Sequence, residues 1–297
     1  MHPRYAESFA EVGTPIRFSG CGGSIIIRDI PGSAAQDAMG CYPLFCCENW
    51  AGLRDDIESL GSRLVTLSLV TDPFGDYTPE YLHACFPDRV HPFKPHYVID
   101  RHESRERTVK KNHRYYARKA LRELTVHAVR DPESFVDEWM TLHQHLVRKH
   151  KIAGLKAFSR HTFLTQLRTP GAVILRAVYR TRTIGAMIFL VQGDVAHAHV
   201  LGCSLEGYER GALYAIIWHT FEFFDDSIRW CNLMGVPGAS ESSAEGIRHF
   251  KQGWTPITRM AYFCGRVLDR TMYEKLSSSP DRSGSTYFPL YRAGELF

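Results

Sequence analysis

Apolar residues recur along the chain with two different periods, and the shorter period is clearest in the second half of the sequence. Residues 173–179, 183–191 and 195–203 are three successive runs rich in Val, Ile, Leu and Ala. The connections between them are short and polar, reading Arg-Thr-Arg at 180–182 and Gln-Gly-Asp at 192–194. Runs of strand length joined by tight turns predict an antiparallel meander of three strands.

A helical period dominates the segments around this meander. Residues 132–149 carry apolar side chains at spacings of three and four, which predicts an amphipathic helix facing a core. A short helix at 159–167, with Ser159 as its cap, leads into the meander. After the meander we expect a helix at 207–224, a strand at 229–234, a helix at 244–251, a strand at 260–267 and a helix at 269–276.

The first third of the chain alternates shorter elements of both kinds. Its strands are predicted at 24–28, 42–46, 63–70 and 96–100, and its helices at 50–60 and 79–85. The strand at 63–70 ends in Thr-Asp-Pro-Phe-Gly-Asp, a turn of the type found at the carboxyl edge of an α/β sheet. A long basic helix at 106–124 and a strand at 126–129 connect this part to the rest.

The order of these elements excludes a doubly wound parallel sheet, because antiparallel strands lie beside a crossover helix. Two helices, three antiparallel strands, then helix, strand, helix and strand follow the order of a GNAT acyltransferase domain. We therefore predict a mixed α/β (α+β) fold of GNAT type.

Composition and charge exclude several classes of function but do not identify one. The chain has 297 residues, a formal net charge of +4 and 44% hydrophobic residues, which is ordinary for a globular protein. Such a mild charge argues against DNA binding and against extensive contact with RNA. The sequence shows no signal peptide and no apolar run of membrane-spanning length, and none of its eight cysteines falls in a CxxC pair. We expect a cytoplasmic protein with reduced thiols and without a metal site.

One segment carries a resemblance to a known family. Residues 246–254 read Gly-Ile-Arg-His-Phe-Lys-Gln-Gly-Trp, and the Phe250-Lys251 pair followed by Trp254 is similar to a motif of the Fem-type (FemAB-like) aminoacyltransferases. The basic segment 111–120 and residues 145–158, where a long helix ends in basic residues, also resemble that family. The resemblance covers 109–276, although the helical hairpin arm of some Fem proteins is missing.

The resemblance implies two tandem GNAT-like halves and an activity. The N-terminal half, residues 1–105, would be degenerate and serve the acceptor. The C-terminal half, residues 106–276, would be the acyltransferase domain. The serine-rich composition after Ser277 separately predicts that residues 277–297 form a loose tail, although 287–291 are suited to dock. The family transfers an aminoacyl group from aminoacyl-tRNA to an amine. No prosthetic group is implied.

By the same resemblance, Lys251 would stabilise the oxyanion of the tetrahedral intermediate, with Phe250 and Trp254 beside the donor. The alternative is a surface lysine on a short helix. A second donor-binding candidate is the junction after the meander, where Gly207 and Gly211 allow close backbone approach and Arg210 is suited to a phosphate. This segment matches the pyrophosphate loop of acetyl-CoA enzymes only at Gly211, so a glycine-rich helix start with a surface arginine is equally open.

Three further sets of residues are candidates for acceptor and base. His197 and His199 lie two apart on a strand and therefore on one face, where either is suited to act as a general base. Neutral core histidines are the alternative, and His249 has no better support. Asp72 and Asp76 in the Asp-Pro turn are suited to bind the acceptor's ammonium, or simply to cap the turn.

The basic helix offers a surface for nucleic acid. Its stripe of positive side chains would hold a tRNA acceptor end, with Tyr115 and Tyr116 stacking on a base or packing inward. The residues proposed for this contact are Lys111, Arg114, Arg118 and Lys119. A solvated helix face is the alternative.

These observations favour an enzyme that transfers an aminoacyl group from aminoacyl-tRNA to an amine of a small molecule or peptide. An acyl-CoA-dependent N-acyltransferase of the same fold is the alternative, and a non-catalytic RNA-binding module is a third hypothesis. The donor amino acid, the acceptor, the pathway and the oligomeric state stay open at this stage.

Overall fold

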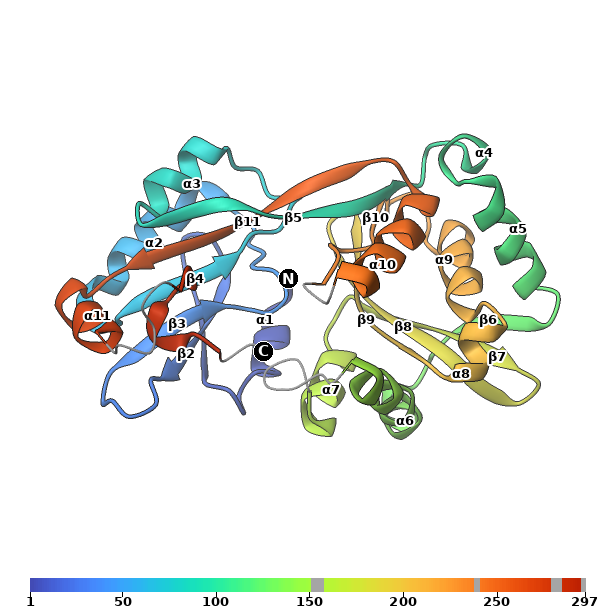
Figure 1. Cartoon of the computed structure of the whole chain (residues 1–297), viewed down its shortest axis with the longest axis horizontal. Coiled ribbons are helices and arrows are strands. Elements are labelled where there is room, and N and C mark those ends of the chain that lie inside the picture. The colour runs from blue at the N-terminus through green and yellow to red at the C-terminus, as the bar shows by residue number, and fades with distance from the viewer. Residues whose placement is uncertain (151–157, 238–240, 279–284, 295–297) are drawn as a thin grey trace.

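The computed structural model describes residues 1–150, 158–237, 241–278 and 285–294. Its strands form one eleven-stranded sheet in the order β1-β2-β3-β4-β11-β5-β10-β9-β8-β7-β6 (Figure 1). The strands are β1 (Thr14–Arg17), β2 (Ser24–Asp29), β3 (Gln36–Gly40), β4 (Thr66–Val70), β5 (Arg89–Asp100), β6 (Leu124–Ala128), β7 (Ala172–Tyr179), β8 (Arg182–Gln192), β9 (Val195–Cys203), β10 (Trp230–Asn232) and β11 (Thr258–Val267).

The helices cover both faces of this sheet. They are α1 (Pro3–Glu7), α2 (Leu53–Leu60), α3 (Pro79–Cys85), α4 (Arg105–Thr108), α5 (Lys111–Ala120), α6 (Pro132–His150), α7 (Arg160–Leu167), α8 (Leu205–Glu209), α9 (Ala212–Phe223), α10 (Glu241–Trp254) and α11 (Arg270–Ser277). Short 3₁₀ turns lie at η1 (Trp50–Gly52), η2 (Gly61–Arg63) and η5 (Leu290–Arg292). Within the described part of the chain, no helix combines the length and apolarity that crossing a membrane requires.

The two halves repeat one plan, as the sequence predicts for tandem GNAT-like units. In the C-terminal half, β7, β8 and β9 form the antiparallel meander, and α9 leads to β10, which is parallel to β9. In the N-terminal half, β1, β2 and β3 are antiparallel, and α2 leads to β4, which is parallel to β3. The fold is therefore a mixed α/β sheet built twice.

The halves exchange their last strands. β11 comes from the C-terminal half but pairs antiparallel with β4 of the N-terminal half. β5 comes from the N-terminal half and pairs antiparallel with β10 of the C-terminal half. The two exchanged strands also pair with each other along most of their length, and they run together across the seam between the halves (Figure 1).

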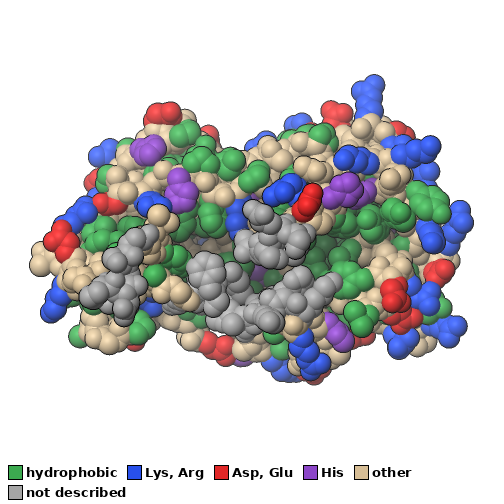
Figure 2. Space-filling model, viewed as in Figure 1, with side chains coloured by type: hydrophobic (Ala, Val, Ile, Leu, Met, Phe, Trp, Pro, Cys, Tyr) green, Lys and Arg blue, Asp and Glu red, His purple; other side chains and the backbone are tan. Residues whose placement is uncertain are grey.

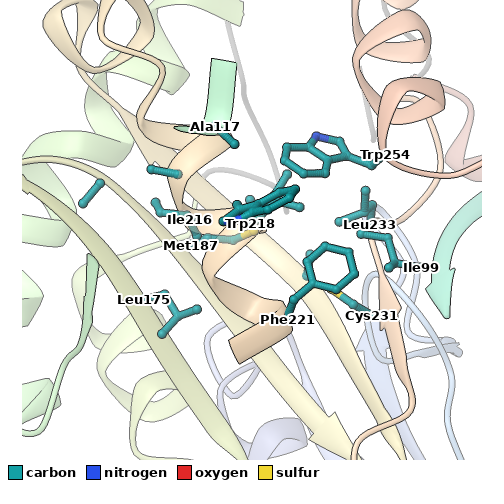
Figure 3. Packing of buried hydrophobic residues seen from close by; sticks show 14 of the residues in the cluster. Ile99, Ala117, Leu175, Met187, Ile216, Trp218, Phe221, Cys231, Leu233 and Trp254 are labelled. Carbon is teal, nitrogen blue, oxygen red and sulfur yellow. The ribbon is translucent and has the colours of Figure 1, made fainter. Parts of the chain in front are cut away.

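The core follows this arrangement. In the C-terminal half, α5 and α9 cover one face of the sheet, and Trp218, Phe221 and Trp254 are part of the apolar cluster that lies there (Figure 3). A second cluster holds α2 and α3 on the N-terminal half. A third cluster crosses the seam, because Tyr5 and Phe9 pack with residues of α6, α7, β2, β7 and β8. The N-terminal segment thus contacts both halves.

The described part of the tail is docked and not loosely attached. Arg292 is 6% exposed, and its guanidinium donates to the fully buried carboxylate of Asp37 at 2.8 and 2.9 Å. Tyr291 donates to the same carboxylate at 3.0 Å. Gly265 in β11 leaves the space that the ring of Phe288 fills, since a Cβ there would lie 2.4 Å from it. The structure thus shows the docked form that the sequence left open for residues 287–291.

Several element boundaries also differ from the prediction. The predicted helix at 106–124 is two helices, α4 and α5, because the N–H of Lys110 bonds the carbonyl of Gly253 in α10. The predicted helix at 207–224 breaks at Gly211, whose φ of 73° lies in the left-handed region. Residues 42–46 form no strand in the structure; Phe45 makes an isolated bridge to Thr71.

Candidate functional site

A row of buried polar groups lies at the seam between the halves. Asn232 of β10 is directly opposite His197 of β9 and Val98 of β5. Side chains of directly opposed residues project from the same face of a sheet, so Asn232 and His197 share a face with His96, two residues before Val98. In the space-filling view the molecule is hollowed between its halves, and basic and histidine side chains gather at the upper rim of the hollow (Figure 2).

Asn232 organises two histidines. Its Oδ1 accepts the N–H of Met234 at 2.8 Å, which fixes the orientation of the amide. Its Nδ2 then donates to Nδ1 of His96 at 3.2 Å and to Nδ1 of His197 at 3.1 Å. Both imidazoles therefore carry their proton on Nε2 when neutral. Burial lowers the pKa of both, that of His96 to about 3, with the positive charges of Lys251 and His197 adding to the effect at His96.

Asp72 lies at one end of the row, in the turn after β4. It is 4% exposed, and its Oδ1 accepts the N–H of Phe74 at 3.0 Å. Its Oδ2 is 3.9 Å from Nε2 of His197, too far for a direct hydrogen bond. Burial and then the negative charge of Asp72 raise the pKa of the neighbouring Cys46 thiol, so that sulfur stays protonated. The neighbouring thiol therefore adds no negative charge to that of Asp72.

Lys251 lies at the other end of the row, on α10. Its Nζ donates to the carbonyl oxygens of Met234 at 3.2 Å and Gly235 at 2.7 Å. Met234 has a φ of 64°, a conformation uncommon outside glycine, and this turns its N–H to Asn232 and its carbonyl to Lys251. Burial, and then the charge of Lys94, lower the pKa of Lys251 to about 7. At neutral pH the lysine is poised between its two protonation states.

Gly235 is required where it stands. A Cβ at this position would lie 2.9 Å from Cβ of Lys94 and 3.2 Å from Cδ2 of His96. The loop after β10 therefore lies flat on β5, and this contact brings the carbonyl of Gly235 to Lys251. Residues 238–240, further along this loop, lie outside the described residues.

Phe250 and Trp254 lie on a different side of α10 from Lys251. Both rings contact Tyr214 of α9, with centroids 5.0 and 5.9 Å apart, and both contact His113 of α5. Trp254 is fully buried. The structure thus uses the aromatic part of the predicted motif to seat α10 in the core, while the lysine faces the seam.

The two histidines of β9 share a face, but they have different surroundings. The register of β8 and β9 shifts at Ile188 and Phe189, and His199 is the extra residue at this bulge. Its Nε2 lies 3.0 Å from Oε1 of Gln166 in α7 and 3.3 Å from the hydroxyl of Tyr5 in α1. Burial lowers its pKa to about 3. The structure brings His197, and not His199, to Asp72 and Asn232.

In the predicted donor loop, Gly207, Arg210 and Gly211 all take part in contacts within the protein. A Cβ on Gly207 would lie 2.1 Å from the carbonyl oxygen of Ile184, so this glycine serves packing of α8 on β8. Arg210 forms ion pairs with Glu206 and Glu123 and lies over the ring of Tyr179. Gly211 begins α9 in a left-handed conformation. The positive charge of Arg210 is therefore already matched by two carboxylates.

The basic helix α5 is exposed on the side that the sequence predicted. Lys111, Arg118 and Lys119 are exposed, whereas Arg114 turns back and donates to the carbonyl of Val109 at 2.8 Å. Tyr115 and Tyr116 are 60% and 47% exposed, and their rings meet edge to face with centroids 5.5 Å apart. Both rings are thus partly open to solvent, and that of Tyr116 also contacts Tyr214, with centroids 5.4 Å apart.

Comparison with known proteins gives a fold and not a sequence family. No family model matches the chain, and no curated protein sequence matches it. The solved structure of FemX superposes with a TM-score of 0.71 at 9% identity, over 92% of each chain. L-PGS from Bacillus licheniformis superposes with a TM-score of 0.59 at 14% identity, over 91% of this chain and 93% of that one.

The chain has the FemX fold. A conserved protein of unknown function from Bacteroides thetaiotaomicron shares it as well, with a TM-score of 0.62 at 12% identity over 89% of this chain and 90% of that one. The resemblance seen in the sequence over 109–276 extends in the structure to the N-terminal half. Residues 151–157, part of the resemblance at 145–158, lie outside the described residues.

Sequence reasoning about this FemX-like chain found three of the five residues of the row and missed two. It singled out Asp72, His197 and Lys251 but not His96 or Asn232. His96 lies in a segment with two prolines, Arg-Val-His-Pro-Phe-Lys-Pro-His-Tyr-Val-Ile-Asp, which disguises a twelve-residue strand. A polar residue within a short apolar strand, as Asn232 is, was the one available signal. Asp76 is exposed, so of the two predicted aspartates only Asp72 reaches the seam.

Proposed function

We propose that this chain transfers an aminoacyl group from aminoacyl-tRNA to the amine of a small molecule or peptide. One observation carries the proposal: on a FemX fold, a half-titrated lysine and a buried carboxylate stand at the two ends of a single polar row at the seam. These are the two charges that aminolysis of an ester requires, a cation for the oxyanion and an anion for the attacking amine.

Lys251 supplies the cation. As an ammonium it has three N–H groups, and the carbonyls of Met234 and Gly235 hold two of them. The third is left to donate to the carbonyl oxygen of the donor ester. When the acceptor nitrogen attacks, that oxygen becomes an oxyanion, and a fixed N–H in a dry site stabilises it by a few kcal/mol, about 3 for one lost donor in comparable sites.

Asp72 receives the acceptor. Its carboxylate pairs with the ammonium of the acceptor and takes the proton that must leave before the nitrogen can attack. The new N–C bond then forms, the ester C–O bond breaks, and the ribose oxygen of the tRNA leaves with the proton that the attacking nitrogen loses as the amide forms. Neutral His197 carries its proton on Nε2, 3.9 Å from Oδ2 of Asp72, and its Nδ1 is taken by Asn232, so this imidazole is not the base.

The contacts of the two predicted donor surfaces favour tRNA over acyl-CoA. The pyrophosphate of CoA would need an unmatched cation near Gly207 and Gly211, and Arg210 there is bound to two carboxylates. The basic face of α5 has exposed Lys111, Arg118 and Lys119 beside two exposed tyrosines. Unpaired bases at a tRNA acceptor end stack on such rings while lysine and arginine contact the phosphates.

The test is transfer of label from a mixture of radiolabelled aminoacyl-tRNAs in the presence of a small-molecule extract, beside a parallel acyl-CoA consumption assay. We expect loss of label from tRNA that depends on the extract and disappears after RNase treatment. Free CoA released with tRNA unchanged would establish the acyl-CoA alternative. RNA binding without turnover in either assay would establish the non-catalytic alternative.

Three variants test the assigned roles. Lys251→Ala should reduce transfer about 100-fold or more, and Asp72→Asn should do the same while keeping the shape of the turn. Lys275→Ala removes an exposed lysine on α11 and should leave transfer unchanged. Equal activity of Lys251→Ala and Lys275→Ala would refute the role of Lys251, provided that both melt as the wild type does.

A further inference from the structure

Beside the polar row lies an arginine that has no acidic partner in the described part of the chain. Arg259 of β11 is directly opposite His96 of β5, so both side chains project from the same face. Its guanidinium lies 4.4 Å from the ring centroid of Phe74 and 4.8 Å from that of Trp230. The two rings are 5.8 Å apart and tilted by 54°, and they form a V against which the guanidinium rests. All three side chains are partly exposed.

The contacts of Arg259 differ from those of its neighbour Arg229. Arg229 also lies over Trp230, at 4.7 Å, but donates to the buried carboxylate of Asp100 at 2.7 Å. For Arg259, no carboxylate of the described residues lies within ion-pair distance, and no described acceptor receives one of its N–H groups. A guanidinium stacked on aromatic faces keeps its N–H edge open for a planar oxyanion.

The aromatic V lies between Arg259 and Asp72, the residue proposed to bind the ammonium of the acceptor. Phe74 meets His197 edge to face, with centroids 5.9 Å apart, and its backbone N–H binds Oδ1 of Asp72. The carboxylate of Asp72 is thus held by the backbone of Phe74, and Arg259, which has no acidic partner among the described residues, rests on the ring of the same residue. A ligand with one ammonium and one carboxylate complements this pair, whereas a doubly charged phosphate would face a single unmatched guanidinium.

We propose that Arg259, held by Phe74 and Trp230, binds the carboxylate of the acceptor, and that the acceptor is a zwitterionic amino acid or short peptide. This inference rests on the acceptor role proposed for Asp72, and it deepens that role by naming the substrate class. The ammonium of the zwitterion pairs with Asp72, and its carboxylate takes a bidentate hydrogen bond from Arg259. The aromatic V shields both contacts from water on one side, which strengthens them.

Binding without turnover tests the proposal. Saturation-transfer NMR would be recorded on the full chain with the twenty L-α-amino acids and a set of dipeptides, and in parallel with the carboxamide of each. Dimethyl phosphate serves as a singly charged phosphodiester probe. We expect at least one amino acid or dipeptide to bind, and its carboxamide to bind about 10- to 100-fold more weakly.

Two arginine variants form a matched pair, because both side chains lie over Trp230. Arg259→Gln should weaken binding of that ligand about 10- to 100-fold, and Arg229→Gln should leave it within twofold of the wild type. Equal binding of the acid and its carboxamide overturns the proposal, as does binding of dimethyl phosphate alone or of no probe. Should Arg259→Gln fail to fold, the carboxamide comparison on wild-type protein decides by itself.

The outcome is separable from that of the proposed transfer reaction. Carboxylate-dependent binding without any transfer from aminoacyl-tRNA would refute the proposed donor and leave this acceptor site standing. Transfer to an amine that carries no carboxylate, unaffected by Arg259→Gln, would refute this site and leave the proposed reaction intact.

Discussion

The packing of α10 makes one glycine indispensable and another replaceable, and both lie in the helix that carries Lys251. A Cβ on Gly253 would lie 1.9, 2.1 and 2.3 Å from three atoms of the His113 ring. Ordinary contact begins near 3.4 Å, so ring and helix would have to separate by about 1.5 Å. His113 cannot yield easily, because it is 4% exposed and its Nε2 bonds the carbonyl of Phe250 at 2.9 Å.

The magnitude of the effect of Gly253→Ala follows from three contributions. Overpacking costs about 1–3 kcal/mol, and loss of the hydrogen bond between His113 and Phe250 costs about 1 kcal/mol. The helix propensity of alanine returns about 1 kcal/mol. We expect unfolding free energy to fall by about 2 kcal/mol. Gly246 lies in the same helix with nothing within 4 Å of its Cβ position, so Gly246→Ala should stabilise by about 0.5–1 kcal/mol.

Urea unfolding followed by circular dichroism measures both variants against the wild type. The two should move the midpoint in opposite directions with an unchanged slope. A Gly253→Ala protein as stable as Gly246→Ala would refute the packing described for α5 and α10. Because α10 carries Lys251, Gly253→Ala should also impair transfer, whereas Gly246→Ala should not.

Three further predictions follow from buried charges and exposed rings. Lys251, with a pKa lowered to about 7, should react with acetic anhydride in a competitive labelling experiment with a midpoint near pH 7, and exposed Lys275 serves as the internal comparison. The unfolded chain keeps the proton of Lys251 up to about pH 10.5, whereas the folded chain loses it near pH 7. The free energy of unfolding should therefore rise between pH 7 and 10.5 by up to about 1.4 kcal/mol per pH unit. Lys251→Met should abolish this rise. Asp37→Asn leaves the guanidinium of Arg292 without its buried carboxylate and should cost about 3–5 kcal/mol in urea unfolding. Tyr115→Ala should weaken binding of a tRNA acceptor-stem oligonucleotide by about 1–3 kcal/mol in fluorescence anisotropy, and equal affinity would exclude stacking on this ring.

Local patterns were enough for most of the fold. The meander of β7, β8 and β9 was predicted within about a residue, because each strand alternates or is buried and each turn is short and polar. The helix α6 was predicted from its apolar stripe. Both rest on interactions between residues near in sequence, and these are what periodicity reports.

Long-range contacts explain what the sequence did not reveal. The break between α4 and α5 depends on a residue more than 140 positions away. There the carbonyl oxygen of Gly253 accepts a hydrogen bond from the backbone N–H of Lys110. The docked tail depends on a carboxylate in β3 and an arginine near the C-terminus. Neither pairing leaves a local signal, because an Asp or an Arg in a polar stretch looks the same whether it is exposed or buried.

The candidate site also contains residues that local sequence could predict and residues that only the fold brings together. Lys251 and Asp72 were predicted individually, from a motif and from a turn. Asn232 connects them only because β10 lies between β5 and β9, an order set by the crossover of α9 and by the exchange of strands. No pattern in the sequence pointed to Arg259 as a binding residue. Its environment is made by two aromatic rings, Phe74 and Trp230, which belong to a turn and a strand distant in sequence.

The exchange of β5 and β11 has a consequence for how the site can change shape. Each half contributes one strand to the sheet of the other, and we call these two strands, β5 and β11, the clasp. A chain cut at residue 105 would therefore leave the sheet of each half without one of its strands. Excision would bare the backbone edge of β4 on one piece and of β10 on the other, and each would be prone to pair with other chains. His96 and Arg259 are carried on the clasp itself. A hinge that separated the two exchanged strands would have to break the ladder that holds these two residues opposite each other, so backbone pairing fixes their relative position.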